Sequence, residues 1–166
     1  MTEENAQWDD PLWRYAVGLY SQPGCAVLCL QLQDDYGLSI NRLLFALWLT
    51  DQQRRYPAQV VLQDADRWQD ERLKPLRELR YGLRGQTESN NEERCYELLK
   101  QAELAAEKVE LERLQQCLID CPETDLIEGL ALENLYSVLP TDAGPGDELR
   151  LRLQQLAGIA AQYGSN

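Results

Sequence analysis

The 166-residue chain is predicted to be an all-α protein, a single-domain multi-helix bundle of about six to seven helices with one long helix. Two observations predict this class. Apolar residues recur at helical spacing from one end of the chain to the other, and no stretch combines period-two alternation with hairpin turns. The length also fits, because a chain of this size can bury a core without disulfides or metals.

Caps and helix breakers mark the first three helices. Asp10 and Pro11 begin the first, which ends at residues 21–24. The second runs from Cys25 to the stop at Gly37. Ser39 caps the third, whose residues 43–49 are apolar on every side, so it should be the most buried element. Nearly complete burial is predicted for Leu44, Leu47, Trp48 and Trp68.

A fourth helical stretch follows Pro57 and runs to about Arg84. Pro75 removes a backbone donor from it, so a kink is expected near residues 73–74. Its predicted apolar stripe consists of Val61, Ala65, Trp68, Leu76, Leu79 and Leu83.

A long helix is predicted over residues 92–118, with a length of about 40 Å. One of its two apolar faces needs a separate cover, and it consists of Leu104, Leu111, Leu114 and Leu118. Two further helices are expected near residues 126–139 and 147–163. We therefore predict a helical core domain over residues 1–121 and a C-terminal extension, residues 122–166, packing on the long helix. If the extension leaves the face uncovered, a homodimer through these four leucines is the simplest closed alternative.

Charge and composition restrict the function. The net charge of −12 argues against nucleic-acid partners and anionic membranes. The absence of histidine excludes Ser-His-Asp and Cys-His nucleophiles, histidine-ligated zinc and the Glu-x-x-His di-iron bundle. The polar, acidic N-terminus and the odd number of cysteines, five, favour a cytoplasmic protein with reduced thiols.

Several segments resemble an uncharacterised all-helical protein family of proteobacteria. They are Leu19-Tyr20-Ser21-Gln22-Pro23-Gly24, Cys29-Leu30-Gln31-Leu32-Gln33-Asp34, Asn41-Arg42-Leu43-Leu44-Phe45-Ala46-Leu47-Trp48-Leu49 and Lys74-Pro75-Leu76-Arg77-Glu78-Leu79-Arg80. With the glutamate-rich long helix, the resemblance covers roughly residues 12–118. It implies a bacterial cytoplasmic helical protein and supplies no activity or catalytic residue.

Three groups of residues are candidates for chemistry. Arg77, Arg80 and Arg84 share one helix face and could bind a phosphate or carboxylate, although glutamates of the long helix are the simpler partners. Acidic helices could hold Mg²⁺, but a solvated face is the simpler interpretation of Asp34, Asp35, Asp64, Asp66, Asp70 and Glu71. Two Cys-x-x-x-Cys pairs are interpreted as buried thiols rather than zinc ligands: Cys25 with Cys29, and Cys117 with Cys121.

The leading functional hypothesis is a non-catalytic, cytoplasmic protein-interaction or regulatory module without a metal or cofactor, which binds a protein partner or a second copy. The alternative is a small-molecule or anion-binding protein that uses Arg77, Arg80 and Arg84. A Mg²⁺-dependent enzyme with aspartate-rich helices is the third possibility.

Overall fold

The computed structural model describes residues 10–140 and 144–165, and it is 76% helical. Within these residues there is no strand, and only an isolated bridge pairs Arg54 with Glu123. The predicted all-α class with one long helix is confirmed. The helices are α1 (Pro11–Tyr20), α2 (Cys25–Tyr36), α3 (Ile40–Asp51), α4 (Gln63–Trp68), α5 (Lys74–Leu83), α6 (Asn90–Gln116), α7 (Leu130–Ser137) and α8 (Asp147–Gly164).

The predicted caps are present. The side chain of Asp10 accepts hydrogen bonds from the backbone N–H groups of Leu12 and Trp13 at the start of α1. The Ser39 hydroxyl accepts from the Arg42 N–H at the start of α3. Gly37 ends α2 with a φ of 67°, the left-handed conformation that glycine adopts without strain. Local sequence signals thus position the ends of these helices.

α3 is the centre of the core, as predicted. All eight residues from Arg42 to Leu49 are buried, and α3 contacts α1, α2, α6, α7 and α8. Trp48 is 3% exposed, in line with the prediction. Trp68 is only half-buried, which corrects the expectation for this residue. Its Nε1 donates to the Ala106 carbonyl over 2.9 Å, and the Arg113 guanidinium lies 4.8 Å from its ring, so the indole packs on α6 at the edge of the core.

Asn134 attaches α7 to the C-terminal end of α3. This side chain is 1% exposed, and its Nδ2 lies within hydrogen-bond distance of the Ala46 and Arg54 carbonyls and the Thr50 hydroxyl. Its Oδ1 accepts from the Tyr56 N–H over 2.8 Å. A single buried amide therefore supplies donors and an acceptor to the end of α3 and the segment after it, and all of its hydrogen-bonding groups are used.

The stretch interrupted by Pro75 continues as one helical rod with an altered register. α4 passes into a π-helical turn over Gln69–Leu73, and α5 follows directly with Pro75 in its first turn. The Lys74 N–H bonds to the Gln69 carbonyl, five residues back. In an α-helix the Glu71 carbonyl would accept a hydrogen bond from the backbone N–H of residue 75, but Pro75 has none. This carbonyl accepts from Arg72 Nη1 over 3.1 Å. The predicted irregularity at residues 73–74 is a wide turn.

The wide turn also changes which leucines are buried. Leu73, outside the predicted stripe, is fully buried, whereas Leu79, within it, is 60% exposed. A π turn contains more residues per turn than an α-helix, so every later side chain is rotated around the axis. Beyond residue 73 the predicted stripe is therefore wrong at Leu79, whereas Leu76 and Leu83 are half-buried.

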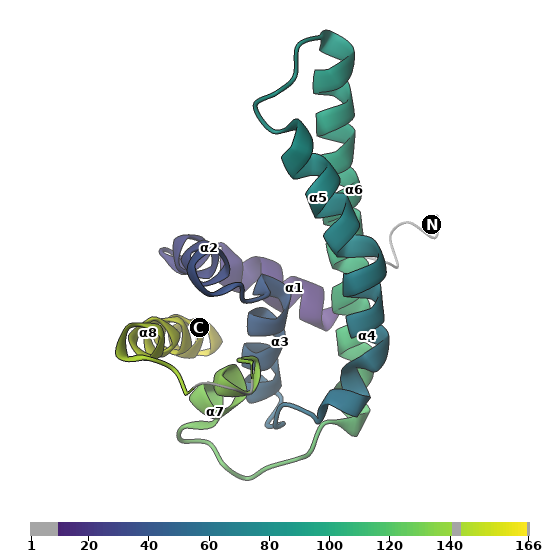
Figure 1. Ribbon diagram of the computed structural model, residues 1–166. Coiled ribbons are helices and arrows are strands. Elements are labelled where there is room, and N and C mark those ends of the chain that lie inside the picture. The colour runs from purple at the N-terminus through teal and green to yellow at the C-terminus, as the bar shows by residue number, and fades with distance from the viewer. Residues whose placement is uncertain (1–9, 141–143, 166) are drawn as a thin grey trace.

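The C-terminal helices correct a second expectation. α7 packs mainly on α3 and α8, and α8 packs mainly on α2 and α7, instead of on the long helix. Figure 1 shows α8 and α2 together on the side of α3 away from α6. Leu149, Leu153 and Leu156 of α8 join the same hydrophobic core as α1 to α3. The division into residues 1–121 and 122–166 stays a prediction.

A helical hairpin projects from this globule (Figure 1). We define the arm as residues 76–102, which comprise α5 from Leu76, the connection to α6 and the first half of α6. No residue of α5 is buried, and the first buried residue of α6 is Glu103. The arm begins where α6 leaves α1, α3 and α4, the helices it contacts lower down.

Gly18 allows α8 to approach α1, and this yields a test of the C-terminal packing. A Cβ at this position would lie 2.0 Å from the Tyr163 hydroxyl oxygen, so Gly18→Ala must displace the tyrosine. We expect a loss of about 1–3 kcal/mol in the free energy of unfolding, measured by urea denaturation. In Tyr163→Ala the same glycine substitution should cost much less. Equal losses in both backgrounds would contradict the packing of α8 on α1.

Candidate functional site

Three glutamates on one face of α6 meet arginines from two other helices. Glu103, Glu107 and Glu110 are spaced by four and three residues, and we call them the acidic stripe. Glu103 is 7% exposed and Glu110 is fully buried. Ionised carboxylates in such a position require charged or hydrogen-bonding partners. The stripe therefore depends on the basic and amide side chains that other helices bring to it.

The lower end of the stripe binds α3. Arg42 Nε donates to Glu110 Oε1 over 3.2 Å, and Asn41 Nδ2 donates to Glu110 Oε2 over 2.8 Å. Arg42 Nη2 also lies 2.8 Å from Asp66 Oδ1 of α4. Burial by itself lowers the pKa of Arg42, but the nearby charges of Glu110, Tyr56 and Asp66 outweigh it and raise that pKa. The guanidinium stays charged and joins three helices.

The upper end of the stripe binds α5. Arg77 Nε donates to Glu103 Oε1 over 3.1 Å, and Arg77 Nη2 donates to Glu107 Oε1 over 3.0 Å. Arg80 Nε donates to Glu103 Oε2. The simpler sequence interpretation of these two arginines, pairing with glutamates of the long helix, is what the structure contains. Arg84, the third member of the predicted anion site, is exposed.

The acidic residues considered as possible Mg²⁺ ligands lie apart and pair with basic side chains. Asp66 faces Arg42, Asp64 pairs with Arg113 over 2.7 Å, and Asp35 pairs with Arg152 over 2.5 Å. Asp70 pairs with Lys74 over 2.5 Å within one helical turn. Across residues 10–140 and 144–165, no group of three or more cysteine, aspartate or glutamate side chains is arranged as metal ligands would be.

The cysteines are free thiols in three different environments. Cys25 and Cys29 are fully buried in α2, and a hydrogen bond between them lowers the pKa of Cys25 and raises that of Cys29. Cys121 is buried, and desolvation raises its pKa to about 12. Its Sγ donates to the Cys117 carbonyl over 3.2 Å. Cys95 is exposed on the arm. The buried thiols behave as small apolar residues.

The predicted partner-binding leucines do not form one exposed face. Leu111 and Leu114 are 2% and 0% exposed and belong to the chain's own core, and Leu118 packs against that core. Leu104 remains 49% exposed. The C-terminal half of α6 packs against α1 and α3. These helices of the same chain therefore cover the part of the predicted face that contains Leu111 and Leu114.

The comparisons with known proteins identify the family. Residues 11–114 match the family described as "Protein of unknown function (DUF2390)". The chain belongs to this family. The matched region begins with the first residue of α1 and ends at buried Leu114, so it contains the whole acidic stripe and all its arginine partners. The match confirms the predicted family resemblance, whereas the proteobacterial origin stays a prediction. No curated protein and no solved structure matches the chain.

Sequence reasoning missed the role of Arg42 and Asn134. Next to Arg42, Asn41 also reaches across to α6, where it donates to Glu110 and to the Glu107 carbonyl. A charged residue at the head of an otherwise apolar helix was the available signal for a buried ion pair. Nothing local to Asn134 indicates its long-range contacts.

Loss of Glu110 would take from Arg42 the fully buried one of its two carboxylate partners and leave only the partly exposed Asp66. We expect Glu110→Ala to lower the free energy of unfolding by about 3–5 kcal/mol in urea denaturation. The double variant Arg42→Met with Glu110→Leu should recover most of that loss, since neither charge is then buried. As a control, Glu148→Ala breaks a solvent-exposed pair and should cost less than about 1 kcal/mol. A cost for Glu110→Ala as small as the control's would contradict a buried ion pair.

Glu107 should make stability depend on pH. Burial raises its pKa more than Arg77 lowers it, so the folded state binds the proton more tightly than the unfolded state. The contribution of this carboxyl is therefore complete below the ordinary glutamate pKa and is lost as pH rises through the raised pKa. In urea denaturation over this range, wild type should lose stability relative to Glu107→Gln as pH increases. If wild type instead gained stability relative to Glu107→Gln as pH increased, the effect of Arg77 on the pKa of Glu107 would outweigh that of burial.

Proposed function

We propose that this chain is a non-catalytic helical module of the cytoplasm that binds another protein through its arm. The observation that carries the proposal is the projection of a two-helix hairpin with exposed leucines away from a complete core (Figure 1). Such a hairpin buries little of its own apolar surface. An apolar surface of this kind, on a rigid projecting element, is typical of a protein-binding site.

Exposed apolar side chains occur on both helices of the arm. Leu79 of α5 is 60% exposed, and Leu98 of α6 is 48% exposed. Cys95, Leu98 and Ala102 are exposed positions separated by three and four residues, and Ala105 continues this spacing beyond the arm. This is the spacing by which one helix packs against another, and small residues in it allow close approach. An amphipathic helix is therefore the partner that suits the arm best.

The arginines favour this function over anion binding. Arg77 and Arg80 are each less than a quarter exposed and are already bonded to Glu103 and Glu107. An external anion would have to displace those carboxylates and leave them partly buried without a counter-charge, which is unfavourable. The arginines instead support the arm by holding α5 against α6.

Paired surface variants test the proposal. Tagged full-length protein would be used to capture partners from the lysate of its source organism, with identification by mass spectrometry. Leu79→Ser with Leu98→Ser should reduce the recovery of a specific partner at least about tenfold. The control, Ile119→Ser with Ile127→Ser, changes two residues that are 82% and 78% exposed outside the arm and should leave recovery unchanged.

Two further measurements make the result decisive. Both double variants should unfold within about 0.5–1 kcal/mol of wild type, because each of the four side chains is about half exposed or more. The purified partner should then bind wild type and the control equally in calorimetry. Equal recovery of every partner by the arm variant and wild type would reject the arm as the binding surface.

A further inference from the structure

The network around the acidic stripe contains more carboxylates than guanidiniums. Four carboxylates and three guanidiniums form it: Glu103, Glu107, Glu110, Asp66, Arg42, Arg77 and Arg80. When every group is ionised, one negative charge lacks a counter-charge within the network. The stripe is largely withdrawn from water, where an unbalanced charge is unfavourable, so one bound proton stabilises the network.

Glu107 is the carboxylate at which we expect this proton. Among the described residues its carboxylate accepts a hydrogen bond from one side chain, Arg77, whose Nη2 lies 3.0 Å from Oε1. Arg77 is shared, because its Nε donates to Glu103. Each of the other two glutamates of the stripe accepts hydrogen bonds from two residues. Glu107 therefore has the least support for a negative charge.

The helices packed around Glu107 supply one cation that faces it. Burial disfavours the ionised carboxyl, Arg77 of α5 favours it, and both neighbouring glutamates of the stripe oppose it, so that the pKa of Glu107 is raised. α3 and α4 contribute Arg42 and Asp66, which pair with each other over 2.8 Å. On α1, burial and nearby groups that include Glu107 raise the pKa of the Tyr20 phenol, which stays neutral.

α5 makes few buried contacts with the rest of the chain (Figure 1). None of its residues is buried, and Gly82 within it is a poorer helix former than alanine. By contrast, Glu110 at the lower end of the stripe is fully buried and bonded to α3. An element with so little buried surface can open while the core stays folded. The ion pairs of Arg77 and Arg80 therefore contribute much of what holds α5 on α6.

We propose that Glu107 makes the arm a pH-sensitive switch, in which loss of one proton loosens α5 from α6. With the proton bound, the charges of the network balance and α5 is held closed. Without it, opening of α5 returns the unbalanced carboxylate to water. One consequence rests on the proposed function: Leu79 of α5 and Leu98 of α6 form a fixed surface only in the closed arm, so a partner should bind more weakly as pH rises.

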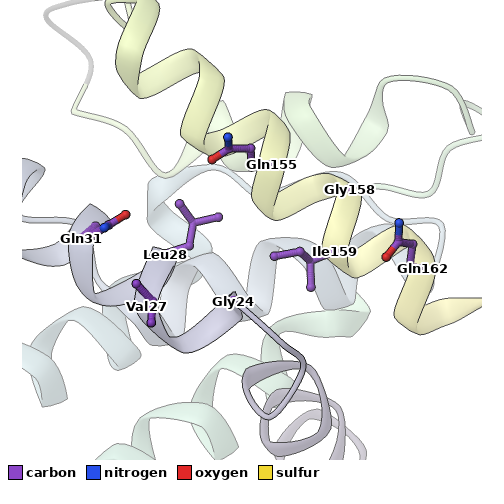
Figure 2. Close-up of a pocket in the computed structure, with 8 residues that line it drawn as sticks. All are labelled: Gly24, Val27, Leu28, Gln31, Gln155, Gly158, Ile159 and Gln162. Carbon is purple, nitrogen blue, oxygen red and sulfur yellow. The ribbon is translucent and has the colours of Figure 1, made fainter.

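Hydrogen exchange of the full-length chain, followed by mass spectrometry from about pH 4 to pH 8, tests the switch. Protection is the chemical exchange rate at each pH divided by the observed rate. The closed arm binds the proton more tightly than the open arm, so protection of α5 should fall by up to about tenfold per pH unit between the ordinary glutamate pKa and the raised pKa. The reference is the amides along the groove between α2 and α8, whose lining residues are uncharged (Figure 2).

Two glutamine variants locate the effect. Glu107→Gln resembles the protonated carboxyl, so α5 should keep the protection of wild type at low pH over the whole range. The matched control, Glu97→Gln, removes a half-exposed carboxylate that pairs with Lys100 on the same helix, and it should retain the pH dependence of wild type. Retention of the pH dependence in Glu107→Gln, or its loss in Glu97→Gln, would overturn the proposal.

Glu103→Gln separates the charge network from burial alone. It removes a neighbouring negative charge and leaves Arg77 to Glu107, so the pKa of Glu107 should fall and the loss of α5 protection should occur at lower pH. A loss at the same pH as in wild type would mean that burial alone sets the response, and it would contradict the network. None of these measurements uses a partner. If the arm bound no protein, the switch would still be tested, and constant protection of α5 across the pH range would overturn it whatever the arm binds.

Discussion

The buried guanidinium of Arg42 constrains the arrangement of the helices around it. It lies at the head of eight consecutive buried residues in α3, where an unpaired cation would be strongly destabilising. α6 must therefore present Glu110, and α4 must present Asp66, at this one point along α3. Apolar burial alone would tolerate several positions of α6 along α3, whereas the ion pair specifies one. The rest of the acidic stripe then follows at fixed helical spacing and receives Arg77 and Arg80 from α5, which sets the direction of the arm.

Much of the fold could be predicted because its signals are local. Asp10, Ser39 and Gly37 act on backbone groups within a few residues of themselves, and each is found where the sequence places it. Likewise, a run as apolar as residues 43–49 has no stable position except the centre of the core. The sequence also predicts that arginines of the fourth helical stretch pair with glutamates of the long helix, because the two helix faces carry opposite charges. The structure contains such pairs between Arg77 or Arg80 and Glu103 or Glu107.

The failures came from contacts between distant parts of the chain. Leu111 and Leu114 are covered by α1 and α3, and no periodicity within α6 shows which of its two apolar faces those helices take. α8 covers α2 instead of the long helix, so the surface left open lies elsewhere. Asn134 joins backbone groups about 80 residues away, and a lone asparagine in a short helix carries no mark of that role.

The π turn before Pro75 rotates the side chains that follow it around the axis of one continuous helical rod. Residues up to the end of the turn are in register with the core, where Ala65 of α4 and Leu73, the last residue of the turn, are buried. Residues after it are in register with the arm, where Arg77 and Arg80 reach the acidic stripe and Leu79 points outward. One extra residue in the turn thus lets two surfaces with different requirements share a continuous backbone without a loop between them. Because no flexible joint intervenes, a force applied at the arm's tip is transmitted as rotation of a stiff element to the ion pairs around Arg42.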